Sequence, residues 1–252
     1  MKSIDFDRVA QVYDLYVSSE FDLAFWVEEC RRHAGPCLEV MCGTGRISLA
    51  VLRAGVELTC VDYSAGMLEV LRAKLQGGPT ARVLERDARD LGFSGEFGFA
   101  FIGFHSLSEL ITPADRLAAL RSLHQALRAG GRLTLSLQNP CVRGPQLDGQ
   151  WRELATAPLP GTPNRLEVRG RFPMDPATKL VRGVQVYREL DPHGRCVREQ
   201  ELPVSFQLVE PSELLEAAAE AGFRPVEAWG DYDRSPFVPV ASPFFLSELE
   251  RE

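Results

Sequence analysis

A glycine-rich turn and two aspartates lie at positions where strands are expected to end. The segment Glu39–Arg46 reads Glu-Val-Met-Cys-Gly-Thr-Gly-Arg, and Asp62 and Asp87 follow the next two apolar runs. Glycines at 43 and 45 would let the backbone approach a ligand closely, because no Cβ obstructs it. A carboxylate at a strand end, such as that of Asp62, can accept both hydroxyl hydrogens of a ribose. The pattern therefore predicts a site for a nucleoside.

A third acidic segment extends this prediction. Residues 86–91 read Arg-Asp-Ala-Arg-Asp-Leu, so the Asp87 carboxylate could accept a hydrogen bond from an adenine amine while the Ala88 N–H meets a ring nitrogen. Taken alone, Gly43-Thr44-Gly45 is equally typical of a tight turn without a ligand. Because ligands of open parallel sheets bind at the carboxyl ends of strands, the combination with Asp62 and Asp87 favours the binding site.

The elements that must position these residues follow from hydrophobic periodicity and turn residues. Strands are expected at 37–41, 56–62, 81–87, 96–104 and 132–139, and helices at 21–33, 47–55, 65–75 and 113–131. Strands that alternate with helices in this way predict a parallel sheet covered on both faces.

The pattern changes after the fifth strand. Residues 165–172, 179–190 and 195–209 lean towards period 2, with turn sequences at 174–176 and 191–194, so an antiparallel meander of three strands is expected. A helix at 211–222 and two last strands follow. We expect an α/β fold: one domain, 1–252, with a seven-stranded mostly parallel sheet, helices on both faces, and residues 150–210 as an antiparallel β cap.

Composition narrows the classes of partner. The net charge of −7 in 252 residues argues against a duplex nucleic acid, whose binding needs clustered Lys and Arg. No apolar run is long enough to span a membrane, and the first residues do not resemble a signal peptide, so a cytoplasmic protein is expected. The six cysteines include no Cys-x-x-Cys pair, so we expect buried thiols and no metal site. Both a monomer and a homodimer are compatible with the sequence.

Four segments within residues 6–140 resemble a known family. The sequences LEVMCGTGRISLAVLRAG and VDYSAGML resemble the first and second motifs of class I (Rossmann-like) S-adenosylmethionine-dependent methyltransferases. ERDARDL is similar to their adenine-binding motif, and LHQALRAGGRLTLSLQNP to their Gly-Gly motif before the fifth strand. The resemblance implies S-adenosyl-L-methionine as cofactor and in-line transfer of its methyl group to a nitrogen or oxygen of a small molecule.

The resemblance also implies roles for single residues. Glu39 would organise the loop near the methionine portion of the cofactor, and Asp62 would hold the ribose. Either Met67 or Tyr63 would pack on the adenine, whose amine Asp87 would bind. The family usually has glycine where this chain has Met41.

Two further residues have two interpretations each. Tyr13, in Tyr13-Asp14-Leu15-Tyr16, either closes over the cofactor, as in related small-molecule enzymes, or is an ordinary residue of an amphipathic helix. Arg46 either reaches the cofactor carboxylate or is a solvated residue in the first turn of its helix.

Methyl transfer requires the protein mainly to align the acceptor and exclude water. A neutral amine needs no base, whereas an oxygen acceptor more often does. His105, directly after the fourth strand, is the candidate for that base and for a contact with the cofactor; the alternative is a structural histidine. Asn139 is a candidate pocket residue. The antiparallel insertion is expected to roof the acceptor pocket with Arg165, Arg169, Tyr187 and Arg188.

Three other functions compete. An NAD(P)-dependent oxidoreductase is disfavoured, because residues 43–48 lack the third Gly or Ala of the dinucleotide fingerprint and no Tyr-x-x-x-Lys pair occurs. A non-catalytic S-adenosylmethionine-binding protein is favoured only by Met41. Methylation of a nucleic acid or protein is the third alternative, although residues 139–142 only begin like an Asn-Pro-Pro-Tyr motif.

Overall fold

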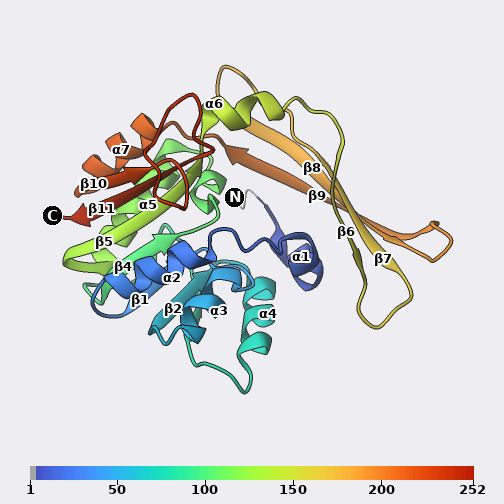
Figure 1. The fold of residues 1–252 in the computed structure, drawn as a ribbon, viewed down its shortest axis with the longest axis horizontal. Helices are drawn as coiled ribbons and strands as arrows, with labels where there is room; N and C mark the ends of the chain where they lie inside the picture. Colours follow the sequence, from blue (N-terminus) through green and yellow to red (C-terminus); the bar gives the residue numbers. More distant parts are fainter. Residues whose placement is uncertain (1–3) are drawn as a thin grey trace.

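The computed structural model describes residues 4–252, and its centre is a seven-stranded sheet (Figure 1). The strand order is β10-β11-β5-β4-β1-β2-β3. Strands β1 to β5 run parallel, and β11 is antiparallel to both of its neighbours. The strands are β1 (Cys37–Val40), β2 (Leu58–Asp62), β3 (Arg82–Glu85), β4 (Phe97–Ile102), β5 (Leu127–Gln138), β10 (Phe223–Trp229) and β11 (Phe244–Arg251). The mostly parallel sheet is confirmed.

Helices cover both faces of this sheet, as the sequence predicts. One face packs against α5 (Pro113–Ala126) and α7 (Pro211–Glu220), and the other against α2 (Leu23–Arg32), α3 (Arg46–Arg53) and α4 (Ala65–Leu75). Helix starts are fixed locally: the Ser64 hydroxyl caps α4, Thr112 caps α5, and Glu210 with Glu213 forms a capping box for α7.

The second sheet has four strands, so the prediction of a three-stranded meander was wrong. It has four antiparallel strands in the order β6 (Arg152–Pro158), β7 (Arg165–Arg171), β8 (Leu180–Leu190) and β9 (Cys196–Gln207). Strand β6 was not predicted, because none of its side chains is fully buried and it therefore carries no clear apolar alternation. This sheet follows β5 through two short helices, α6 (Pro140–Arg143) and η3 (Gly144–Gln146).

The N-terminal segment packs on the second sheet. It consists of η1 (Phe6–Arg8) and α1 (Ala10–Tyr16), and α1 lies between α4 and the second sheet in Figure 1. Val9 of this segment shares an apolar cluster with Val168 and Leu202 of that sheet. Within residues 4–252, no helix combines the length and apolar character needed to cross a bilayer.

The ends of α5 and β4 differ from the expectation. The fifth helix ends at Ala126 rather than 131, and the residues up to Gly131 form a bulge in β5. Strand β4 ends at Ile102 because Phe104 and His105 both adopt left-handed backbone conformations, with φ of 50° and 62°. They are followed by the short helix η2 (Ser106–Glu109).

Candidate active site

Three adjoining cavities lie at the carboxyl ends of β1, β2, β3 and β4. The edge pocket, about 110 Å³, is lined by Val40, Met41, Asp62, Tyr63, Arg86, Asp87, Ala88, Arg89, Glu109, Leu110, Ile111 and Asp115. The loop pocket, about 50 Å³, is lined by Tyr13, Val17, Glu39, Met41, Cys42, Gly43, Thr44, Arg46, Ile47, Gly103, Phe104 and Ser106. Met41 belongs to both, so the two pockets share a wall.

The third cavity, the largest of these three, lies between the main sheet and the second sheet, and we call it the inter-sheet pocket. Its volume is about 450 Å³. It shares Tyr13, Val17, Phe104 and Ser106 with the loop pocket and Glu109 with the edge pocket. Its other lining residues are Ile4, Phe6, Tyr16, Ser19, Phe21, His105, Ser108, Gln138, Arg143, Leu154, Phe172, Gln185, Val204, Phe206 and Phe244.

Asp62 fixes the glycine-rich turn at the junction of the first two pockets. The Gly43 N–H donates to one carboxylate oxygen of Asp62 at 2.8 Å, and the Ser64 N–H donates to the other at 2.9 Å. Burial raises the pKa of Asp62, and these N–H donors oppose the rise. A Cβ added at Gly43 would meet nothing within 4 Å, so the turn exposes bare backbone to the loop pocket.

Gly45 is required for packing, and this gives a stability prediction. Its φ is +84°, and a Cβ there would lie 2.3 Å from Cδ1 of the fully buried Leu71. We expect Gly45→Ala to lower the free energy of unfolding by roughly 2–4 kcal/mol, because left-handed strain adds to overpacking. Gly55→Ala is the matched control: its φ is +81° but nothing lies within 4 Å of the added Cβ. Equal losses for the two variants in urea titrations would contradict this account.

Glu39 and Met41 flank the start of the turn. Glu39 is buried and accepts a 2.5 Å hydrogen bond from the Ser48 hydroxyl, which links β1 to α3. Burial raises the pKa of Glu39 well above its usual range. Met41 has a φ of 63°, a left-handed conformation that favours glycine. The conformation is one that glycine adopts without strain, which accords with the glycine that is usual in the resembling motif.

Asp87 and Ala88 line the edge pocket as predicted, but the Asp87 carboxylate already has a partner. Arg89 donates to its two oxygens at 2.9 and 2.6 Å and also reaches Asp115 at 2.7 Å. The Arg89 guanidinium holds the pKa of Asp87 below its usual range. An adenine amine would therefore share Asp87 with Arg89.

Of the two residues expected to pack on adenine, the structure brings only one to the pocket. Tyr63 lines the edge pocket, and its hydroxyl donates to the Ile4 carbonyl at 2.5 Å. Met67 is a buried residue of α4, 2% exposed, and does not line any of the three pockets.

Arg46 fits neither of its two interpretations fully. It lines the loop pocket, but its guanidinium donates to the buried Asp22 at 2.8 Å and to the Ser19 carbonyl at 2.8 Å. It also lies 4.6 Å from the centre of the Phe104 ring. Tyr13, by contrast, stands in the wall between the loop pocket and the inter-sheet pocket.

His105 lines the inter-sheet pocket, where its ring stacks on Phe244 with 4.9 Å between the centroids. Its Nδ1 is buried and has no hydrogen-bond partner among residues 4–252. Burial is the main cause that lowers the pKa of His105 to about 4. The imidazole is therefore neutral at pH 7 and a weak base.

Asn139 has a structural role instead of the expected place in the pocket. It is 2% exposed, and its amide donates to the carbonyls of Pro239 and Ser242 at 2.8 and 2.7 Å. Its side-chain oxygen accepts from the Cys141 N–H and so caps α6. These bonds tie the end of β5 to the loop before β11.

The second sheet roofs the inter-sheet pocket, but not with the residues that the sequence predicted. The roof consists of Leu154, Phe172, Gln185, Val204 and Phe206. Arg165 and Arg169 are exposed on the other face of β7, because side chains alternate along a strand. Arg188 pairs with Glu167 at 3.0 Å, away from the cavity.

Tyr187 does not line the inter-sheet pocket but contacts Gln185, which does. It is 5% exposed in the cluster beneath α1, and its hydroxyl donates to the Gln185 side-chain oxygen at 2.9 Å. The Gln185 amide in turn donates to the Tyr16 hydroxyl at 3.1 Å.

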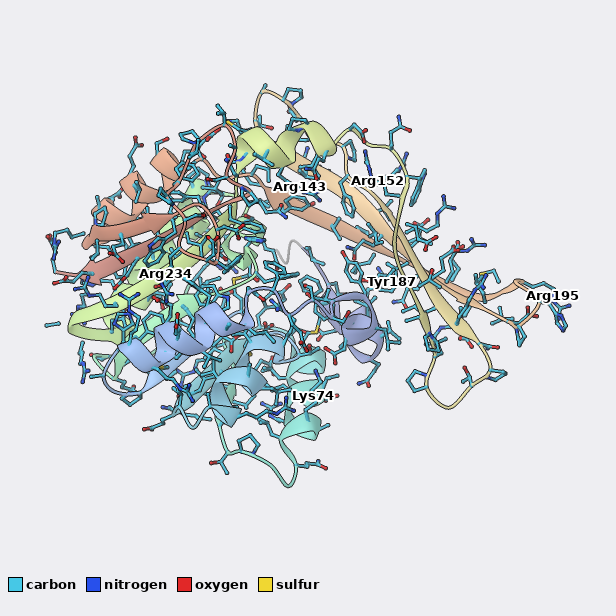
Figure 2. The ribbon with its side chains drawn as sticks, in the orientation of Figure 1. Lys74, Arg143, Arg152, Tyr187, Arg195 and Arg234 are labelled. Atoms are coloured by element: carbon cyan, nitrogen blue, oxygen red, sulfur yellow. The ribbon has the colours of Figure 1, made fainter. Side chains whose placement is uncertain are left out.

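Two charged residues line the inter-sheet pocket that were not predicted from the sequence. Glu109 ends η2, and burial together with Asp62 raises its pKa to about 8. Arg143 lies at the end of α6, close to the base of β8, whereas Arg195 lies at the far tip of the second sheet (Figure 2). Glu109 follows β4 closely, so the rule that located Asp62 and Asp87 could have found it; no local signal marked Arg143.

Comparison with known protein sequences gives two findings. Residues 37–131 match a family model described as "Methyltransferase domain". The putative methyltransferase YqeM of Bacillus subtilis is 31% identical over 133 residues, which cover 52% of this chain and 54% of that protein. The chain thus spans about half the length of the curated relatives it matches.

Solved structures share the fold over nearly the whole chain. The CcbJ methyltransferase from Streptomyces caelestis superposes with a TM-score of 0.83 at 22% identity, covering 100% of this chain and 99% of that one. The sugar N-methyltransferase KedS8 from a Streptoalloteichus species gives 0.74 at 23% identity, with 97% and 93% covered. Residues 37–131 therefore carry a methyltransferase domain, and the chain has the fold of the class I, Rossmann-like methyltransferases.

Proposed function

We propose that this protein transfers the methyl group of S-adenosylmethionine to an amine nitrogen of a small molecule of the amino-sugar type. The observation that carries the proposal is the shared wall between the loop pocket and the inter-sheet pocket. Tyr13, Phe104 and Ser106 face both cavities, so a cofactor in one would lie against an acceptor in the other.

The residues of the edge and loop pockets fit the cofactor chemically. Asp62 retains acceptor capacity for a ribose beyond its two N–H donors, and the open space beside Gly43 leaves backbone accessible to the amino-acid end. When bound, S-adenosylmethionine supplies a methyl group already activated on its sulfonium sulfur. The chain then has to bind the acceptor, orient its nucleophile and exclude water, and the aromatic walls of the inter-sheet pocket are suited to these tasks.

The low pKa of His105 favours nitrogen over oxygen as the acceptor atom. A base with a pKa of about 4 contributes little to deprotonating a hydroxyl near pH 7. A neutral amine needs no such base. Two structures that share this fold bear names that agree with this choice, the sugar N-methyltransferase KedS8 and the amino pentose methyltransferase CalS10.

The proposal is tested in two stages. Calorimetry with S-adenosylhomocysteine and with NADH should show binding of the first only; binding of NADH alone would favour the dinucleotide oxidoreductase instead. The protein is then incubated with methyl-labelled S-adenosylmethionine and matched pairs of amino sugars and their hydroxy analogues. We expect label in the amino compounds. Label confined to hydroxy compounds would contradict the nitrogen assignment, and no transfer at all would favour a non-catalytic binding protein.

His105 itself provides a prediction. We expect His105→Asn to leave kcat within about fivefold, because general-base catalysis would be worth roughly 10²–10⁴-fold and this imidazole is a poor base. Asparagine is chosen because it tolerates the left-handed φ of 62° at this position. A loss of a hundredfold or more in kcat with unchanged S-adenosylhomocysteine affinity would establish His105 as a catalytic residue.

A further inference from the structure

The inter-sheet pocket contains two side chains of opposite charge that lack a charged partner. Among residues 4–252, neither Glu109 nor Arg143 forms an ion pair, either with each other or with another residue. Arg143 donates one bond to the neutral Gln146 at 2.8 Å, and its Nε is buried without a partner. No side chain of the described part of the chain hydrogen-bonds to the Glu109 carboxylate.

Charged groups without a partner are unfavourable in a partly buried cavity, and the pKa shifts of Glu109 and Arg143 reflect this cost. Burial raises the pKa of Glu109 and lowers the pKa of Arg143, in each case disfavouring the charged form. A protein retains such groups at a cost in stability, and they concentrate where a ligand completes the charge balance. The other arginine near α6, Arg152, is paired with Asp148 at 2.7 Å and lies outside the pocket lining.

The two groups occupy different parts of the pocket. Glu109 also lines the edge pocket, where Asp62 raises its pKa, so it lies on the side of the cofactor. Arg143 lies near Tyr16, which is held in place by the amide of Gln185. Between these ends the walls are aromatic rings and neutral polar groups.

We propose that the methyl acceptor carries two charges: a basic nitrogen bound by Glu109 next to the cofactor, and an anionic group, carboxylate or phosphate, bound by Arg143 across the pocket. This inference rests on the proposed function and specifies its acceptor. Glu109, whose raised pKa favours the protonated form, would accept the proton of the incoming ammonium and leave the neutral amine that methyl transfer requires. An anion at Arg143 would compensate a cation that has no charged partner among residues 4–252. Arginine suits either anion, because its planar fork donates two parallel hydrogen bonds.

The test uses calorimetry on the full chain saturated with S-adenosylhomocysteine. The probes are three series of increasing chain length: simple alkylamines, ω-aminoalkyl carboxylates and ω-aminoalkyl phosphates. We expect one of the two anionic series to bind roughly tenfold or more tightly than the alkylamine of the same length, as a charge-assisted hydrogen-bonded pair would give. Whichever anionic series binds more tightly identifies the anion.

Two variants test which residue binds the anionic end of the acceptor and which binds its amine. Arg143→Gln should abolish the advantage of the anionic probes while leaving alkylamine affinity unchanged, and Arg152→Gln is the matched control that should keep the advantage. Glu109→Gln should weaken all three series by about tenfold, a larger loss than any change in its affinity for S-adenosylhomocysteine.

Several outcomes would overturn the inference. These are equal affinity of matched probes at every length, absence of measurable probe binding, an anionic advantage that persists in Arg143→Gln, or a Glu109→Gln variant that loses S-adenosylhomocysteine instead of amines. If the wild-type chain does not bind S-adenosylhomocysteine, both the proposed function and this inference are wrong. If it binds and amines are methylated without an anionic advantage, only the acceptor class is wrong.

Discussion

Replacing Asp62 with alanine is expected to weaken S-adenosylhomocysteine binding by roughly 1–3 kcal/mol, about five- to 150-fold in Kd. The variant removes the carboxylate proposed to hold the ribose. It also removes the acceptor for the Gly43 and Ser64 N–H groups, so the glycine-rich turn loses the residue that fixes it. Calorimetry measures the affinity, and thermal unfolding checks that the variant folds.

Asp115→Asn is the matched control for this experiment. Asp115 also lines the edge pocket, but it lies at the start of α5 and pairs with Arg89 at the partly exposed rim. We expect its effect on affinity to stay below about 1 kcal/mol. If Asp62→Ala folds normally and binds S-adenosylhomocysteine as tightly as the wild type, the assignment of the ribose site is wrong.

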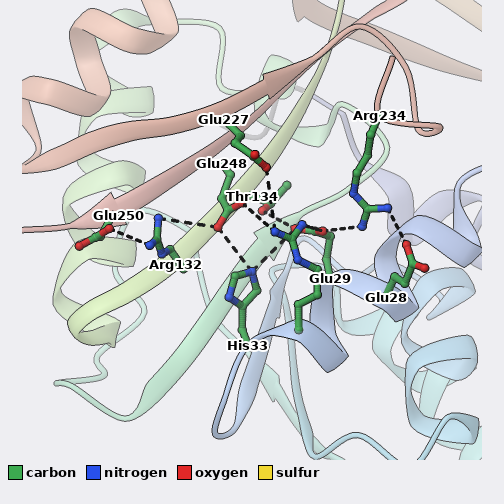
Figure 3. A network of polar contacts seen from close by, with 10 residues as sticks. Glu28, Glu29, His33, Arg132, Thr134, Glu227, Arg234, Glu248 and Glu250 are labelled. Carbon is green, nitrogen blue, oxygen red and sulfur yellow. Dashed lines mark hydrogen bonds and ion pairs between the residues drawn. The ribbon is translucent and has the colours of Figure 1, made fainter. Parts of the chain in front are cut away.

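The largest expected effect on stability is that of Glu29, in a buried ionic network on the α2 side of the sheet (Figure 3). Its side chain is fully buried and accepts bonds from Arg32 and Arg234, both at 2.7 Å. We expect Glu29→Ala to lower the free energy of unfolding by roughly 3–5 kcal/mol, because it removes the buried carboxylate that joins the two arginines and leaves Arg234 with only its exposed partner Glu28.

The same network predicts how stability depends on pH. Burial opposes ionisation of Glu29, but bonds from His33, Arg234 and Arg32 outweigh it and lower the pKa to about 2. Because the folded pKa lies below the unfolded value of about 4.3, the contribution is complete above that value and disappears as pH falls towards 2. Urea titrations of wild type and variant should therefore show a smaller difference in the free energy of unfolding near pH 3 than at pH 7.

Glu28→Gln is the control for Glu29→Ala. Glu28 pairs with the same arginine, Arg234, at 2.6 Å, but its side chain is 65% exposed. A pair exposed to that extent contributes about 0–1 kcal/mol. Similar losses of stability in the two variants would contradict the role given to buried charge.

The network also has the donor set of a metal site, with ligand atoms of Glu29, His33 and Glu248 within 4.8 Å of one another. Cations of the chain already compensate its carboxylates: besides the partners of Glu29, Arg132 lies 3.8 Å from Glu248. We therefore interpret it as an ion network that joins α2 to β5, β11 and the loop after β10.

The sequence predicted the main sheet well because its signals are local. Apolar runs ending at Val40 and Asp62 and glycines at 43 and 45 mark strands and turns without reference to distant residues. The carboxyl-edge rule then correctly brought Glu39, Asp62 and Asp87 to adjoining pockets. Strand β6 was not predicted, because an exposed edge strand needs no apolar alternation.

What could not be predicted depends on contacts between distant segments. The partner of Arg46 is Asp22, which lies before a different helix, so nothing near Arg46 indicated that its charge is compensated. In the second sheet, period 2 separates two faces but does not say which one turns towards the main sheet. That is why exposed arginines of β7 were expected in the pocket and Gln185 was not.

The position of α1 has a consequence for the order in which ligands come and go. Its Tyr13 and the following Val17 stand between the loop pocket and the inter-sheet pocket, and Asp14 fastens the helix to Thr44 of the turn at 2.6 Å. An acceptor in the inter-sheet pocket would lie against Tyr13 and Val17 and so cover the loop pocket. We therefore expect compulsory-order kinetics, with the cofactor first to enter and S-adenosylhomocysteine last to leave. Competitive inhibition by S-adenosylhomocysteine against S-adenosylmethionine alone would be the kinetic signature of this arrangement.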